Sequence, residues 1–119
     1  MKRFLWIIMC LTAAMIILPP GIYSQESEYE MRTVGHHDDD VLGVFVNEDD
    51  TQVATCSLDE TIKIWTLPEG NLYRTFEGHL GQVNNISFSG NDKWLASGSS
   101  DQTVRIWNVE TGEQMAALK

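Results

Sequence analysis

The chain has 119 residues, enough for one small domain, and carries 17 acidic against 8 basic side chains, a formal net charge of −9. This balance argues against nucleic acid and anionic membrane surfaces as partners, because both are bound by clusters of lysine and arginine. It is compatible with a soluble protein and with a basic partner.

The first 24 residues differ in composition from the rest of the chain. Two basic residues precede an apolar run of 15 residues, Phe4–Leu18, and a Pro-Pro-Gly sequence then ends any helix. This order is that of a secretory signal peptide. We therefore expect a hydrophobic helix in residues 1–24, either cleaved off or kept as an N-terminal anchor. The run is short for a bilayer span, which needs about 20 residues.

Residues 25–34 are expected to be an acidic linker that ends in one lone strand. After it, two stretches, 35–77 and 78–119, show the same order of apolar runs and turn residues. The strands expected in them are 41–46, 52–57, 61–66, 72–76, 83–88, 94–99, 103–108 and 114–118. Short strands with turn signals every ~8–12 residues are typical of an all-β protein.

The two stretches are copies of each other at a spacing of 42 residues. Trp107 lies 42 positions after Trp65, and Asp101 lies 42 positions after Asp59. Because a repeated unit fixes the architecture, each copy is expected to form one four-stranded antiparallel sheet. Apolar residues fall on both faces of this small sheet, so it has to pack between neighbours.

A Gly-His pair at the start, four strands and a tryptophan in the third strand make each copy similar to the WD40 repeat of β-propellers. The resemblance implies two blades of a propeller, which typically closes with about 4–8 blades. We therefore expect an incomplete propeller that does not close on itself. Two departures are Thr66 and Asn108 in place of the family's aspartate after tryptophan, and one extra residue between His36 and Val41.

The resemblance also implies a buried hydrogen-bonded tetrad of His, Ser or Thr, Asp and Trp in each blade. The residues that match are His36, Thr55, Asp59 and Trp65 in the first copy and His79, Ser97, Asp101 and Trp107 in the second, with Ser57 and Ser99 as alternative hydroxyls. An indole N–H needs an acceptor when buried, and a hydroxyl can accept from it and donate onward to an imidazole.

The turn that follows the first Gly-His pair is rich in acid. His36 to Asp40 could hold a divalent metal by composition, but adjacent side chains rarely all face one ion, so we predict neither a metal nor another cofactor. We expect this turn on the same rim as Asp59 and Asp101. The residues predicted to contact a partner are His37, Asp38, Asp39 and Asp40.

The sequence gives little reason to expect catalysis. His79, Asp101 and Ser97 match a hydrolase triad in composition, but the serine lies on a predicted strand and no nucleophile elbow or oxyanion-hole motif is present. Cys56 is expected to be a buried apolar side chain.

The sequence thus predicts a non-enzymatic, exported scaffold, periplasmic or secreted, that touches a membrane only if its N-terminal segment is uncleaved. Its expected partner is a protein or peptide, further WD repeats, or other copies of itself that close the propeller. One alternative is an N-terminal fragment of a longer exported propeller protein with no independent activity. Another is an exported propeller enzyme whose active site needs additional blades.

Overall fold

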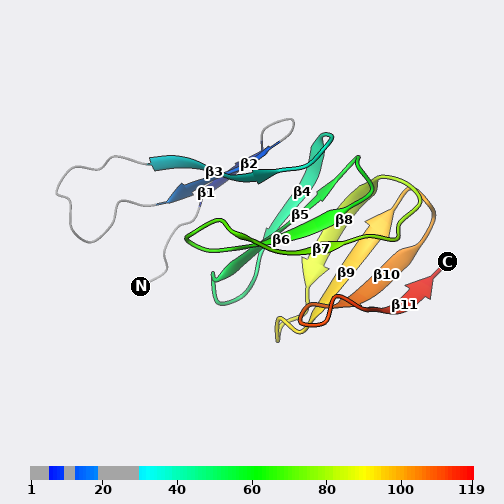
Figure 1. Cartoon of the computed structure of the whole chain (residues 1–119). Helices are drawn as coiled ribbons and strands as arrows, with labels where there is room; N and C mark the ends of the chain where they lie inside the picture. The colour runs from blue at the N-terminus through cyan, green and yellow to red at the C-terminus, as the bar shows by residue number, and fades with distance from the viewer. Residues whose placement is uncertain (1–5, 10–12, 19–29) are drawn as a thin grey trace.

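The computed structural model describes residues 6–9, 13–18 and 30–119, which form three antiparallel sheets (Figure 1). The N-terminal sheet has the order β1-β2-β3, with bounds Trp6–Met9, Ala13–Leu18 and Glu30–His36. The middle sheet, blade one, has the order β4-β5-β6-β7, with bounds Val41–Val46, Gln52–Ser57, Ile62–Thr66 and Leu72–Phe76. The last sheet, blade two, has the order β11-β10-β9-β8, with bounds Gln114–Leu118, Val104–Asn108, Trp94–Ser99 and Val83–Phe88. The prediction of an all-β fold with two four-stranded antiparallel sheets is confirmed.

Two of the strands begin one residue later than predicted. The strands expected at 61–66 and 103–108 start at Ile62 and Val104. The backbone N–H groups of Thr61 and Thr103 instead donate to the Asp59 and Asp101 carboxylates, at 2.9 Å in both blades. These threonines therefore belong to the turn and not to the sheet.

The predicted N-terminal hydrophobic helix lies in residues 1–24, of which 1–5, 10–12 and 19–24 are outside the described residues. Within the same segment, residues 6–9 and 13–18 form two paired strands, and β2 pairs with β3. The helix as predicted, and the cleavage of residues 1–24, stay predictions.

In the described part of the chain we find no helix that is long and apolar enough to cross a membrane.

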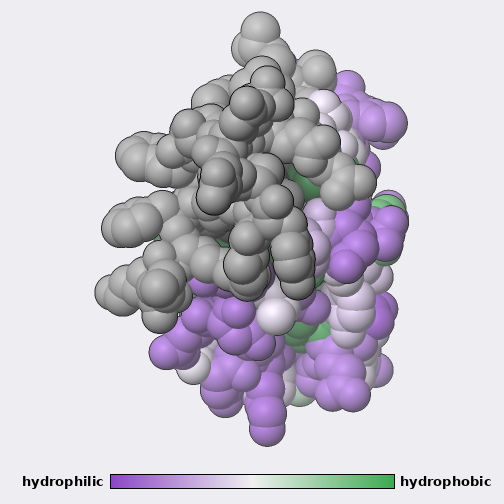
Figure 2. Space-filling model, turned by 90° about the vertical axis from the view of Figure 1, so that its left-hand side faces the viewer, coloured by the Kyte–Doolittle hydropathy of each residue, from purple (hydrophilic) through white to green (hydrophobic). Residues whose placement is uncertain are grey.

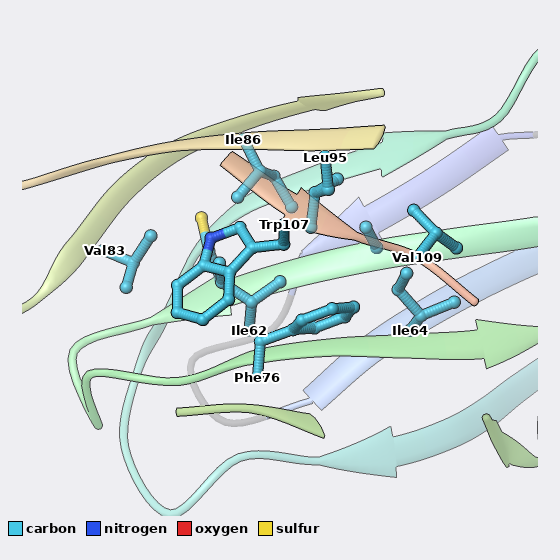
Figure 3. Packing of buried hydrophobic residues seen from close by; sticks show 10 residues of the cluster. Ile62, Ile64, Phe76, Val83, Ile86, Leu95, Trp107 and Val109 are labelled. Carbon is cyan, nitrogen blue, oxygen red and sulfur yellow. The ribbon is translucent and has the colours of Figure 1, made fainter. Parts of the chain in front are cut away.

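The main core lies between the two blades (Figure 3). Blade one contributes Ile62, Ile64 and Phe76, and blade two contributes Trp107 with its aliphatic neighbours. The rings of Phe76 and Trp107 meet edge to face, with their centroids 5.7 Å apart. The packing of one sheet against the other removes apolar surface from water, and this burial is the main force that holds neighbouring blades together.

A smaller core lies on the other face of blade one. It contains Val34, Val53 and Trp65, with Val44, Val46 and Leu67 packed against it. Gly35 lies directly on the indole of Trp65, where an added Cβ would come within 2.1 Å of a ring carbon. The chain that enters blade one therefore packs flat against the tetrad tryptophan.

The face of blade two that corresponds to the Ile62 and Phe76 face of blade one is open. Val104 pairs with Leu118 in the register of β10 and β11, so the two side chains share a face. They are 45% and 60% exposed, and no other described element covers them. Figure 2 views the molecule from another side, where the surface of the described residues is mostly hydrophilic, with small hydrophobic patches between polar side chains.

Candidate functional site

In blade two a chain of hydrogen bonds joins the four predicted residues. The Trp107 indole N–H donates to Ser97 Oγ at 2.8 Å, and Ser97 Oγ lies 2.7 Å from His79 Nε2. His79 Nδ1 lies 2.8 Å from Asp101 Oδ2. Since the serine oxygen accepts from the indole and the carboxylate can only accept, the network places the imidazole proton on Nδ1. The serine hydroxyl then donates to Nε2.

Blade one forms the same chain with a different histidine. The Trp65 indole N–H donates to Thr55 Oγ1 at 3.0 Å, and Thr55 Oγ1 lies 2.7 Å from His37 Nε2. His37 Nδ1 lies 2.9 Å from Asp59 Oδ2. His37, not His36, therefore occupies the histidine position, and the assignment of His36 to the tetrad is corrected.

The cause of this difference is the length of the turn between the histidine and the first strand of the blade. His37 lies four positions before Val41, as His79 lies four positions before Val83. The extra residue of blade one thus lies before the tetrad histidine. His36 ends β3 and is exposed, and its carbonyl accepts a hydrogen bond from Lys63 Nζ at 3.0 Å.

Each tetrad aspartate also organises the turn around it. Asp59 Oδ1 accepts from the hydroxyl of Thr61 at 2.7 Å, and Asp59 Oδ2 accepts from the backbone N–H of Asp38 at 3.0 Å. Burial alone would raise the pKa of Asp59, but the hydrogen bonds from Thr61, His37 and Asp38 outweigh it and lower the pKa to about 2. The carboxylate is therefore ionised at any physiological pH.

Blade two repeats this arrangement. Asp101 accepts from the Thr103 hydroxyl at 2.6 Å and from the backbone N–H of Leu80 at 3.0 Å. Burial opposes the effect of these bonds, and the net result is again a lowered pKa. Sequence reasoning assigned no role to the two threonines, although Thr103 lies 42 positions after Thr61 and two positions after the aspartate.

The two alternative hydroxyls lie outside the tetrads. The Ser57 hydroxyl donates to the backbone carbonyl of Asp39 at 3.2 Å, and the Ser99 hydroxyl donates to that of Gly81 at 2.9 Å. Each therefore ties the turn that enters its blade to the end of the second strand.

The predicted partner-contact residues fall into two groups. His37 is 3% exposed and belongs to the tetrad, so it is withdrawn as a contact residue. Asp38 and Asp39 are exposed, and Asp40 is half-buried. At the position of Asp38 in the second copy stands Leu80, which is 83% exposed.

Burial shifts the pKa values of two groups in the direction that disfavours their charged forms. Burial lowers the pKa of His37, although the hydrogen bond and the charge of Asp59 work in the opposite direction. Burial raises the pKa of Cys56 to about 12, and this thiol lies in the core between the blades. A thiol of that kind is a poor nucleophile, because the thiolate is the reactive form.

Within the described residues the structure holds no group of three or more side chains arranged to bind a metal ion. The hydroxyl of Ser97 is buried and already bonded to both Trp107 and His79. The residues that match a hydrolase triad in composition therefore form an internal structural chain, which no substrate can reach from outside.

Comparison with known proteins agrees with this geometry. The model of the WD domain, G-beta repeat (WD40), matches residues 28–66 and 70–108, which is most of the chain. This chain belongs to the WD40 family. WD40-repeat proteins are generally non-enzymatic scaffolds that bind protein partners.

Among curated proteins, the chain is similar to Transducin beta-like protein 3 of Mus musculus, with 38% identity over 52 residues. The match covers 44% of this WD40 chain and 6% of the mouse protein. The chain thus corresponds to a small part of the length of that relative.

Proposed function

We propose that this WD40 chain is an exported, non-enzymatic module that binds a protein or peptide partner through the rim that carries Asp38, Asp39 and Asp40. The observation that carries the proposal is the distribution of polar groups at this rim. The tetrad side chains bond to one another, whereas the carboxylates of Asp38 and Asp39 lie at the surface.

The acidic turn is held in a fixed shape. The Asp38 backbone N–H donates to Asp59, and the Asp40 carbonyl accepts from the Leu58 backbone N–H at 2.9 Å. The Asp39 carbonyl accepts from Ser57. A surface that is ordered before it meets its partner loses less entropy on binding, which favours affinity.

The chemistry of the rim indicates the class of partner. Three successive aspartates attract a basic segment, and the exposed Leu80 of the neighbouring blade offers an apolar contact on the same rim. A peptide with lysine or arginine beside an apolar side chain fits this surface.

The contact proposal is tested with a peptide library and a charge-neutralised variant, Asp38→Asn/Asp39→Asn/Asp40→Asn. The matched control, Glu48→Gln/Glu69→Gln/Glu113→Gln, removes three exposed charges from the turns at the opposite strand ends. We expect peptides with a basic residue beside an apolar one to bind wild type and the control alike, and the aspartate variant at least tenfold more weakly. Equal affinities for all three proteins would refute the contact.

Export is tested separately, by fusing residues 1–30 to a reporter enzyme that is active only outside the cytoplasm. The basic, apolar and helix-breaking order of this segment supports the proposal. Reporter activity should appear, and should disappear when two leucines of the apolar run are replaced by arginine. The mass of the secreted product shows whether residues 1–24 are removed. A reporter that stays inactive contradicts export.

A second candidate function is self-association that closes the propeller. The open face with Val104 and Leu118 favours it, because the same face of blade one is covered by blade two. Three or four copies would supply six or eight blades, within the range of closed propellers of about 4–8. Light scattering should then give a trimer or tetramer that Leu118→Asp dissociates. A wild-type monomer argues against closure.

A further inference from the structure

A groove crosses the boundary between the two blades at the rim opposite to Asp38–Asp40. It has a volume of about 380 Å³ and lies between the β4–β5 turn and Tyr73 of blade one and the β8–β9 and β10–β11 turns of blade two. Its lining includes Asn47, Asp49, Tyr73, Lys93, Trp94 and Glu110.

The base of the groove is held by hydrogen bonds between the blades. The buried amide of Asn47 donates to Asp92 Oδ2 at 3.1 Å, and the backbone N–H of Glu48 reaches Asp92 Oδ1 at 3.3 Å. Behind one wall, Arg74 of blade one donates to the backbone carbonyl of Glu110 at 2.6 Å. The groove is therefore a formed feature of the two-blade unit.

Its walls combine aromatic and acidic side chains. Tyr73 and Trp94 are 41% and 36% exposed, so part of each ring is available to a ligand. Asp49 and Glu110 are exposed, and hydrogen bonds from Thr51 and Asn47 lower the pKa of Asp49. The groove thus offers carboxylates beside aromatic surface.

The charge of the surrounding rim favours a cation. The four turns at this end of the strands, residues 47–51, 67–71, 89–93 and 108–113, contain seven acidic residues and one basic residue, Lys93. A concave site lined by one sign of charge raises the local concentration of ligands of the opposite sign. An anionic ligand would be repelled from the same groove.

We propose that this groove binds one arginine or lysine side chain of a partner peptide. The aliphatic stem lies along Tyr73 and Trp94. The Trp94 ring also attracts the cationic head, whereas the Tyr73 ring already carries the Arg74 guanidinium, 5.5 Å from its centroid. The head group pairs with Asp49 and Glu110. This site is separate from the acidic turn at Asp38–Asp40, because the two sites lie at opposite ends of the strands.

The test uses two peptides, acetyl-Gly-Gly-Arg-Gly-Gly-amide and the same peptide with glutamate in place of arginine. Binding is followed by the NMR shifts of the Trp94 indole N–H, with the other tryptophan indoles as internal references. The arginine peptide should shift Trp94 in a saturable way and the glutamate peptide should not. Equal shifts with both peptides, or shifts that spare Trp94, would overturn the proposal.

Two exposed substitutions of opposite sign sharpen the test. Glu110→Gln removes a carboxylate and should weaken arginine-peptide binding at least threefold, whereas Lys93→Gln removes the lysine that lines the groove and should strengthen it at least threefold. Glu69→Gln is the matched control, because it lies on the same rim outside the groove. If Glu110→Gln and Glu69→Gln have the same effect, general rim charge and not the groove binds the peptide, and the proposal fails.

The outcome is independent of the partner contact proposed above. The Asp38→Asn/Asp39→Asn/Asp40→Asn variant should bind the arginine peptide at the groove with unchanged affinity. Loss of binding in that variant, with Trp94 unshifted, would place basic peptides at the acidic turn alone and remove the groove as their site.

Discussion

Blade one and blade two have the same internal hydrogen bonds but differ in what covers them. In both, a tryptophan, a hydroxyl, a histidine and an aspartate form one chain with donor–acceptor distances of 2.7–3.0 Å. Ile62 and Phe76 of blade one are 0% and 2% exposed, whereas Val104 and Leu118 at the same positions of blade two are 45% and 60% exposed. The polar tetrad is thus a property of a single blade, and hydrophobic burial is a property of a pair.

The same contrast appears at single residues of the second strand in each blade. Cys56 fills space between the blades, and the corresponding position in blade two is Gly98, where an added Cβ would meet nothing within 4 Å. Packing side chains are present where a neighbour covers the sheet and are small or exposed where none does.

The largest expected difference in stability effects concerns the sheet face that carries Phe76 in blade one and Leu118 in blade two. Phe76→Ala should lower the free energy of unfolding by about 3–5 kcal/mol, because it opens a cavity in the core. Leu118→Ala should change it by no more than about 0.5 kcal/mol, because the side chain is exposed. Urea unfolding measures both. Comparable losses would mean that the open face of blade two is covered in solution.

The tetrads, by contrast, should respond alike. His37→Ala and His79→Ala should each cost about 1–3 kcal/mol, since each leaves a buried hydroxyl and a carboxylate without their partner. His36→Ala is the matched control and should stay within about 0.5 kcal/mol. A larger effect at His36 than at His37 would reverse the assignment made from the hydrogen bonds.

Two glycines test the close packing against blade one and the open space beside blade two. Gly35→Ala places a methyl group against the Trp65 ring and should cost about 1–3 kcal/mol. Gly98→Ala has free space and should be neutral or stabilise by about 0.5 kcal/mol, because glycine is unfavourable inside a strand. Thermal unfolding compares the two, and a costly Gly98→Ala would show that something covers blade two.

The smallest effect expected is a pH dependence of stability, whose step near neutral pH originates in His37 of blade one. The pKa of His37 is lowered in the folded state, so below about pH 6.5 the unfolded chain binds protons that the folded chain does not. The free energy of unfolding should therefore fall as the pH decreases from 7 to 5. It should fall again as the pH decreases below about 4, as Asp59 and Asp101 are protonated.

The first of these declines should be smaller in His37→Gln, which lacks the titrating group, and unchanged in His36→Ala. Urea midpoints measured at each pH provide the comparison. A decline that His37→Gln leaves intact would assign the effect to another group.

Much of the fold could be predicted from the sequence, because strand alternation and turn residues act locally. The repeat of 42 residues placed the strands of both blades to within one residue at their starts. The hydrogen-bond partners of Trp65 and Trp107 followed from the family pattern, since a buried indole needs one acceptor in a fixed place.

The tetrad histidine of blade one and the groove could not be predicted correctly, because both depend on how turns are placed in space. The Gly-His pair pointed to His36, whereas the geometry of the turn depends on the count from the histidine to Val41. The repeat spacing itself, counted back from His79, reaches His37. The groove at Tyr73 and Trp94 could not be predicted, because it exists only where the turns of two blades lie side by side.

The outer strand of blade two has a consequence for the behaviour of the protein in solution. β11 ends its sheet, and its exposed side chains include Met115 and Leu118. A strand of this kind presents unpaired backbone groups beside apolar surface, which is a template for pairing with another chain. Glu113 precedes this strand and Lys119 follows it, and charged residues at an edge, lysine above all, oppose such pairing. Solubility at high concentration should therefore depend on the charges beside this edge strand more than on the net charge of the whole chain.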